Sequence, residues 1–297
     1  MTALSTTATT PQPGPRAHRL TGLIRRRPVT SFLVVIFAVA WPALGIPRLA
    51  GHSIAPDRLD LVLSALAFVL LFGTAVAVTA VSDGRPGVRR LLAGLVRWRI
   101  GVGWWLLVVA ALPALTLAIA AATGTLRTPP GGWWQMTMTY LLTGLVGGTV
   151  LTNVWEEAAW SGFVQHRLMN RHGLLTGSVL TAVPFALIHV PGTFQNTPAA
   201  VAVFQVGALA VLAPFLRYLL GAVFLDTGGS ILAVGVLHAS FNATGTLAAA
   251  AGGWQFVPAL LVLVGVVALH RRLRRRSRAS RPTERPSSRP EIDATRA

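Results

Sequence analysis

The sequence contains no cysteine and no lysine, and acidic residues are scarce. Its 297 residues include nine aspartates and glutamates against 26 basic residues, all of them arginine, and charged residues make up only 12% of the chain. The lack of cysteine excludes disulfide bonds and thiolate metal sites. A soluble domain of this length would carry about twice this charged fraction, so a soluble globular fold is not expected.

Hydrophobic residues are abundant and gathered in long runs. They make up 53% of the chain, and the mean hydropathy is +0.60. Several nearly charge-free windows reach about 20 residues, the length that crosses a bilayer core. The runs predict an all-α fold, a polytopic transmembrane bundle of about eight helices. The predicted spans are 29–47, 61–81, 102–122, 140–165, 174–191, 199–216, 230–249 and 255–270.

The arginines predict how this bundle is oriented. With the N-terminus in the cytoplasm, 23 of the 26 arginines fall on the cytoplasmic side, including Arg217 at the end of the sixth span. The outer side holds only Arg48, Arg58 and Arg127. This asymmetry follows the positive-inside rule and predicts cytoplasmic N- and C-termini. The basic C-terminal segment is then expected beside anionic membrane lipids, and nucleic acid is not an expected partner.

Composition divides the chain into three parts. We expect a disordered basic segment at 1–28, a membrane-embedded helical domain at 29–270, and a disordered arginine-rich cytoplasmic tail at 271–297. The apolar stretch after residue 28 resembles a signal peptide, but Trp41 and Pro42 follow its small residues at once. A retained first helix is therefore the favoured interpretation.

Ionisable residues are rare inside the predicted spans. Because burying such groups in a bilayer costs several kcal/mol, their presence there indicates a functional site. Two adjacent glutamates are the only acidic residues between Asp83 and Asp226. The candidates are Glu156, Glu157, His189 and His238, with Asn153, Asn242 and Gln205 as polar neighbours.

Helix geometry brings several candidates to one depth. Glu156 precedes the polar turn between the fourth and fifth spans by about 14 residues, and His189 follows it by about 15. At 1.5 Å per residue, both lie about 21–23 Å from that turn. His238 and Asn242 are four residues apart and share a helix face, as do Phe185 and His189. The adjacent glutamates diverge by about 100°, so they cannot share one role.

These residue types predict hydrolytic chemistry. A carboxylate beside a neutral imidazole can hold and deprotonate a water molecule. A second histidine with an asparagine on the same face can donate hydrogen bonds to an oxyanion. This combination fits hydrolysis of an amide bond. Alternatively, Glu156, His189 and His238 could hold Zn²⁺, which would activate the water; the sequence leaves both versions open.

Three motifs carry a family resemblance. The segments EEAAWSG, FALIH and HASFN, in this order, resemble the EExxxR, FxxxH and HxxxN motifs of the CAAX-protease and bacteriocin-processing (CPBP, or ABI) intramembrane protease family. The clear match covers about 150–245, within an expected family core of about 140–250. Family members are described both as metalloproteases and as metal-free glutamate proteases.

The resemblance implies an intramembrane endopeptidase. By it, Glu156 would activate water together with His189, while His238 and Asn242 would stabilise the oxyanion. The expected substrate is a membrane-associated protein or peptide, CAAX-like and lipidated in some members. We expect a multi-pass protein of the cell membrane, in bacteria the plasma membrane.

One position departs from the family pattern. The arginine of EExxxR falls on Ser161, and a serine hydroxyl can donate a hydrogen bond to Glu157 but supplies no positive charge. Glu157 is therefore expected to be protonated, or bonded to Ser161, an indole N–H or a distant arginine. On this hypothesis Glu157, Ser161 and Phe185 support the site structurally and are not catalytic.

Two other functions are compatible with the same residues. One is a non-catalytic membrane scaffold or bacteriocin self-immunity protein. The other is a proton-coupled transporter, in which glutamate and histidine relay protons. The polar residues cluster at one level and no inverted repeat is evident, which favours the protease.

Overall fold

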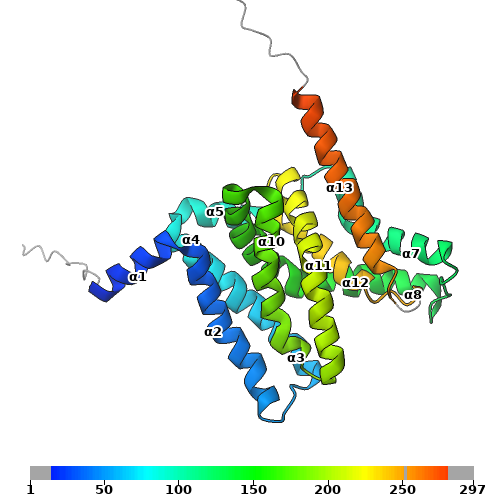
Figure 1. Ribbon diagram of the computed structural model, residues 1–297, viewed down its shortest axis with the longest axis horizontal. Coiled ribbons are helices and arrows are strands. Elements are labelled where there is room, and N and C mark those ends of the chain that lie inside the picture. Colours follow the sequence, from blue (N-terminus) through cyan, green and yellow to red (C-terminus); the bar gives the residue numbers. More distant parts are fainter. Residues whose placement is uncertain (1–14, 251–252, 280–297) are drawn as a thin grey trace, which may run out of the picture.

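The computed structural model describes residues 15–250 and 253–279, and these residues are almost entirely helical (Figure 1). The described residues contain no β-strand, only an isolated antiparallel bridge between Leu126 and Ala250. The predicted all-α class is confirmed. The α-helices are α1 (Pro15–Arg26), α2 (Pro28–Leu49), α3 (Pro56–Ala65), α4 (Gly73–Ser82), α5 (Gly84–Leu95), α6 (Val102–Leu106), α7 (Leu112–Ala122), α8 (Gly132–Met138), α9 (Val154–Ala159), α10 (His166–Thr193), α11 (Ala199–Asp226), α12 (Ile231–Thr244) and α13 (Phe256–Ala279).

Short π-helical turns interrupt several of the long helices. They widen the helix by one residue per turn and join the α-helices without a loop. Within the described residues they are η1 (Leu66–Phe72), η2 (Leu107–Ala111), η3 (Thr139–Gly147), η4 (Thr149–Asn153) and η5 (Trp160–Gln165).

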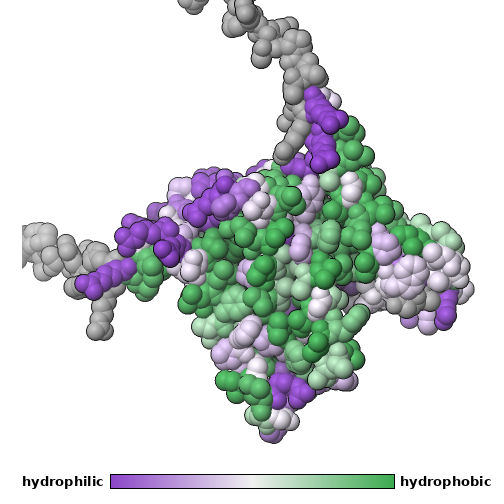
Figure 2. Space-filling model, in the orientation of Figure 1, coloured by the Kyte–Doolittle hydropathy of each residue, from purple (hydrophilic) through white to green (hydrophobic). Residues whose placement is uncertain are grey.

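The surface is that of a membrane protein. Six stretches of the described chain have the length and apolar composition to cross a bilayer. Figure 2 shows hydrophobic residues covering the middle of the molecule, with hydrophilic residues gathered around α1 and α5 and at the end of α13. The predicted multi-pass bundle is thereby supported. The six stretches are Pro28–Leu49, Pro56–Ser82, Val102–Ala122, Gly132–Thr193, Ala199–Asp226 and Phe256–Arg274.

The six stretches differ in number from the eight predicted spans for two reasons. Gly132–Thr193 reverses direction at Gly173, whose backbone is non-helical (φ 78°, ψ 172°), so it contains both predicted spans 140–165 and 174–191. Helix α12 has 14 residues, about 21 Å, and is shorter than the predicted span 230–249 and than a bilayer core of about 30 Å. The number of crossings and the side of the termini stay predictions.

The predicted disorder of 1–28 is wrong for its second part. Residues 15–26 form helix α1, in which Leu20 and Leu23 are exposed and the contact with the bundle is made near its C-terminal end. Ile24 packs against the core, and Arg25 Nε donates to the carbonyl of Val81 at 3.1 Å. Residues 1–14 lie outside the described part of the chain.

The predicted boundary of the C-terminal tail is also wrong. Helix α13 continues beyond residue 270 to Ala279. Arg271 forms an ion pair with Asp226 and donates to the carbonyl of Ala222 at 3.2 Å, which ties this basic turn to the end of α11. The rest of the predicted tail, 280–297, lies outside the described residues.

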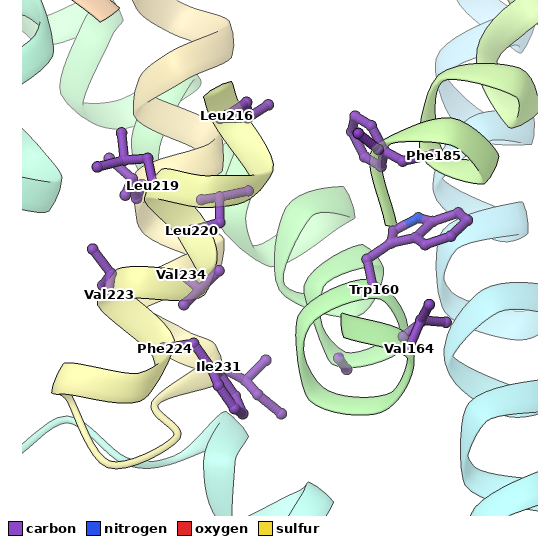
Figure 3. Close-up of a cluster of buried hydrophobic side chains, with 14 of the residues drawn as sticks. Trp160, Val164, Phe185, Leu216, Leu219, Leu220, Val223, Phe224, Ile231 and Val234 are labelled. Carbon is purple, nitrogen blue, oxygen red and sulfur yellow. The ribbon is translucent and has the colours of Figure 1, made fainter. Parts of the chain in front are cut away.

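The core is centred on α11 and the hairpin formed by η5 and α10. Figure 3 shows the apolar side chains of α11, such as Leu216 and Leu220, on one side and Trp160 and Phe185 on the other. Trp160 is fully buried, and its ring meets the edges of Phe32 and Phe185 at centroid distances of 6.1 and 5.7 Å. This packing holds the helices that carry the candidate residues against one another.

The reversal at Gly173 depends on glycine. Its φ and ψ lie in a region that only glycine adopts without strain, and a Cβ there would meet no neighbouring atom. We expect Gly173→Ala to lower the free energy of unfolding by about 1–3 kcal/mol through backbone strain alone. The control Gly207→Ala, in helical backbone with equally open space, should be neutral or stabilising. Thermal unfolding in detergent would compare them, and equal stability of the two variants would contradict the prediction.

Candidate active site

The glutamate pair lies on α9, between two π-helical turns. Turn η4 ends where α9 begins, and η5 follows it directly. Such turns are uncommon and occur frequently at functional sites. The two side chains diverge, as expected from their adjacency: that of Glu156 is 16% exposed and that of Glu157 is fully buried. The two carboxylates therefore occupy different environments.

Glu157 is held by an ion pair with Arg217 and by hydrogen bonds from Ser161 and His238. Arg217 Nη1 donates to its Oε1 at 2.8 Å, and both side chains are fully buried. The Ser161 hydroxyl donates to Oε2. Of the partners considered from the sequence, Ser161 and a distant arginine are thus the ones found. The indole N–H of Trp160 is buried without a hydrogen-bond partner among the described residues.

The location of Arg217 differs from the one predicted from the sequence. It was expected at the cytoplasmic end of a span, because a charge usually marks where an apolar run ends. It lies instead inside α11 and is fully buried. The signal that could have found it is the apolar sequence on both of its sides, which continues to Asp226. An arginine inside such a run must be paired, and Glu157 is its partner.

Three polar side chains along one helix face accept hydrogen bonds from Arg217. Glu157, Ser161 and Gln165 follow at four-residue intervals and are all fully buried. Arg217 Nη2 donates to Ser161 Oγ at 2.8 Å, and its Nε donates to Gln165 Oε1 at 2.9 Å. Gln165 Nε2 in turn donates to Ser178 Oγ at 3.0 Å and to the carbonyl of Arg217 at 2.6 Å. The network satisfies the buried charges, which is the condition for tolerating them.

Two glycines allow the helices to approach this network. A Cβ at Gly221 would lie 2.3 Å from Gln165 Nε2, so a larger residue would displace the amide that orients Arg217. A Cβ at Gly235 would lie 2.9 Å from the Cα of Val154, so α12 contacts the backbone of α9 there. Both helices need these glycines to reach the glutamate pair.

His238 is brought to the glutamates by α12. The helix starts with Ser230, whose hydroxyl accepts a hydrogen bond from the backbone N–H of Ala233. Two turns later His238 Nδ1 donates to Glu157 Oε1 at 2.9 Å and lies 3.8 Å from Glu156 Oε2. This bond leaves Nε2 of His238 available for another partner. Asn242, one turn further along α12, is exposed.

Glu156 and His189 share a cavity. It has a volume of about 280 Å³ and lies between α2, α3, η1, α9 and α10. His189 Nδ1 donates to the carbonyl of Phe185 at 2.6 Å, so its free ring nitrogen is Nε2. The sequence predicts that this carboxylate and this imidazole lie at one level, and both line this cavity. The cavity is lined by Ala40, Leu44, Leu63, Leu66, Ala67, Leu70, Leu71, Glu156, Ile188, His189, Gly192 and Thr193.

Phe185 lies at the centre of the arrangement. Its ring centroid is 4.7 Å from that of His189 and 5.9 Å from that of His238. The guanidinium carbon of Arg217 lies 5.2 Å from the same centroid. The aromatic ring therefore packs against both histidines and the buried cation at once.

The residues considered for a metal do not form a metal-binding group as arranged. Each histidine has its Nδ1 hydrogen-bonded and its Nε2 free, a pattern typical of zinc ligands. However, no three histidine, aspartate or glutamate side chains of the described residues are grouped closely enough to hold an ion. Glu156 lines the cavity together with His189, and its Oε2 lies 3.8 Å from His238 Nδ1, which already donates to Glu157.

The sequence of this region matches a known family. Residues 132–244 match the family model described as type II CAAX prenyl endopeptidase Rce1-like. This part of the chain is similar to that family. The match confirms the resemblance indicated by the three motifs, and the matched region includes the glutamate pair, both histidines, Asn242 and Arg217. No curated protein matches the chain significantly.

Because α12 contacts the backbone of α9 at Gly235, we expect a larger side chain at this position to destabilise the protein. Gly235→Ala places a methyl group 2.9 Å from the Val154 Cα, and overpacking of this kind costs about 1–3 kcal/mol. We expect a lower unfolding temperature. Gly245→Ala is the matched control, because its Cβ would lie 3.6 Å from the nearest atom. Thermal unfolding of both variants in one detergent tests this; unchanged stability of Gly235→Ala would disprove the close approach.

Proposed function

We propose that the protein is an intramembrane endopeptidase that hydrolyses a peptide bond of a membrane-associated, CAAX-like substrate. The observation that carries the proposal is that Glu156 and His189, on separate helices, line one cavity. The match of residues 132–244 to a CAAX endopeptidase family model supports the same activity. We further propose that the protein acts in the bacterial plasma membrane.

In the proposed reaction, Glu156 is the general base. A water molecule between Glu156 and Nε2 of His189 attacks the carbonyl carbon of the scissile bond, and its proton passes to the carboxylate. The proton is then delivered to the leaving amine as the C–N bond breaks. A carboxylate at 16% exposure is reachable by water, whereas fully buried Glu157 is not, which supports the division of roles.

The developing oxyanion needs hydrogen-bond donors on the opposite side of the carbonyl. The Nδ1 of His238 lies 3.8 Å from Glu156 Oε2, and the side chain of His238 is only 4% exposed. In the proposed mechanism its Nε2 donates to the oxyanion once the substrate carbonyl is bound beside it. Asn242 follows on the same face of α12, and its amide would supply a second donor. Donors aimed at a developing charge in a low-dielectric site stabilise the transition state strongly.

The lining of the cavity supports an apolar substrate. Apart from Glu156, His189 and Thr193, it consists of aliphatic side chains and one glycine. Such a wall would bind aliphatic residues or a lipid chain next to the scissile bond, because burial of apolar surface is favourable. The substrate in this proposal is therefore a membrane-associated and lipidated protein or peptide.

Loss of the proposed base should abolish cleavage. We expect Glu156→Gln and His189→Ala to lower kcat by roughly 10²- to 10⁴-fold, the usual contribution of general acid–base catalysis. The assay uses purified protein in liposomes and quenched fluorescent peptides, including prenylated CAAX peptides. Asp57→Asn, at the exposed start of α3, serves as control. If wild type and Glu156→Gln cannot be distinguished on any peptide, the scaffold or carrier function takes precedence.

The mechanism without a metal step gives a separate expectation. Incubation with a zinc chelator should leave the cleavage rate of the wild-type protein unchanged, because the carboxylate and the imidazole suffice to activate water. The rate is measured before chelation, after it, and after zinc is added back. A rate that falls on chelation and returns with zinc would establish the metal-bound alternative.

A further inference from the structure

We infer that Arg217 is a positioning residue of the active site. By holding Glu157, it keeps that carboxylate bonded to Nδ1 of His238 and so aims Nε2 of His238 at the substrate. The inference rests on the proposed function. It also assigns to α11 the cation that the family motif carries on the glutamate helix itself, at the position that is Ser161 here.

The geometry of Glu157 leaves it one orientation. Its Oε1 accepts from both Arg217 Nη1 at 2.8 Å and His238 Nδ1 at 2.9 Å. Its Oε2 accepts from Ser161. Rotation of the carboxylate would break at least two of these bonds in a site without water access. The orientation of the His238 ring is thereby linked to the position of the guanidinium.

The guanidinium is itself held on several sides. It makes four hydrogen bonds to Glu157, Ser161 and Gln165, from three of its nitrogens. Its own carbonyl accepts from Gln165 and from Ser178. A planar fork with five N–H donors can make such a set, whereas the compact ammonium of lysine cannot span it. Arg217 is thus a rigid element between α11 and the glutamate helix.

Positions 161 and 217 face the same buried space. Arg217 Nη2 lies 2.8 Å from Ser161 Oγ, so a guanidinium can enter from either helix but not from both. The chain has the small residue at 161 and the arginine at 217. An arginine moved to 161, with a small residue at 217, should therefore reach Glu157 from its own helix, one turn away.

The competing explanation is that the Glu157–Arg217 ion pair only stabilises the fold. A double variant distinguishes this role from the positioning of His238. Replacing both partners, as in Glu157→Met with Arg217→Met, leaves no unpaired buried charge, so the protein is expected to fold. His238 then loses its anchor. We expect kcat to fall roughly 10- to 100-fold, the usual effect of losing a partner that orients an active-site histidine, with KM unchanged. If the ion pair only stabilises the fold, the folded double variant should keep the wild-type kcat.

The experiment compares the double variant, Arg217→Met, the relocation Ser161→Arg with Arg217→Ser, and the control Arg271→Gln. The control breaks the ion pair of α11 with Asp226, away from the site, and should keep wild-type kcat. The readouts are kcat and KM on a cleaved peptide, and the ¹⁵N NMR signal of hydrogen-bonded His238 Nδ1, assigned with His238→Gln.

We expect loss of the Nδ1 signal and of kcat in the double variant, and recovery of both on relocation. A folded double variant with wild-type kcat and an unchanged Nδ1 signal would overturn the positioning role. A relocation variant that folds but recovers neither would overturn the equivalence of positions 161 and 217. If the wild-type protein cleaves no peptide, the proposed function fails, and the NMR signal still decides whether Arg217 positions His238.

Discussion

A carboxylate buried in an apolar bundle has to be paired, and the structure of the site depends on how this is achieved. Glu157 is fully buried, and its charge is compensated by Arg217, which is equally buried. Removing two charges from water costs several kcal/mol per ion, so the pair is tolerated only with its remaining hydrogen bonds satisfied. Ser161, Gln165 and His238 provide them.

This pairing determines which helices must meet. The glutamate helix, α11 and α12 each contribute at least one charged or polar group to this network, so none of them can shift without leaving a buried group unsatisfied. Gly221 and Gly235 permit the necessary approach, since side chains there would contact Gln165 and the backbone at Val154. Phe185 adds an aromatic surface for both histidines and the guanidinium.

Two adjacent residues of the same type thereby occupy different environments. Helical geometry turns Glu157 toward the bundle interior and Glu156 toward the cavity that also contains His189. In the proposed mechanism one carboxylate holds the site together and the other performs the proton transfer. Both glutamates lie on α9, and the π-helical turns η4 and η5 precede and follow that helix directly.

The sequence by itself determined the all-helical class and the reversal near Gly173, because these follow from local composition. From the rise per residue it also predicted one level for Glu156 and His189, and both line the same cavity. It also restricted Glu157 to a few partners. It did not identify Arg217, which is 60 residues from Glu157 in the chain and belongs to no local motif. Nor did it predict that helix α1 forms within the basic N-terminal segment or that α13 continues into the basic C-terminal one. Those features depend on contacts between helices. Only the tertiary structure decided them, because a countercharge can come from any helix that packs close enough, and periodicity does not record which one does.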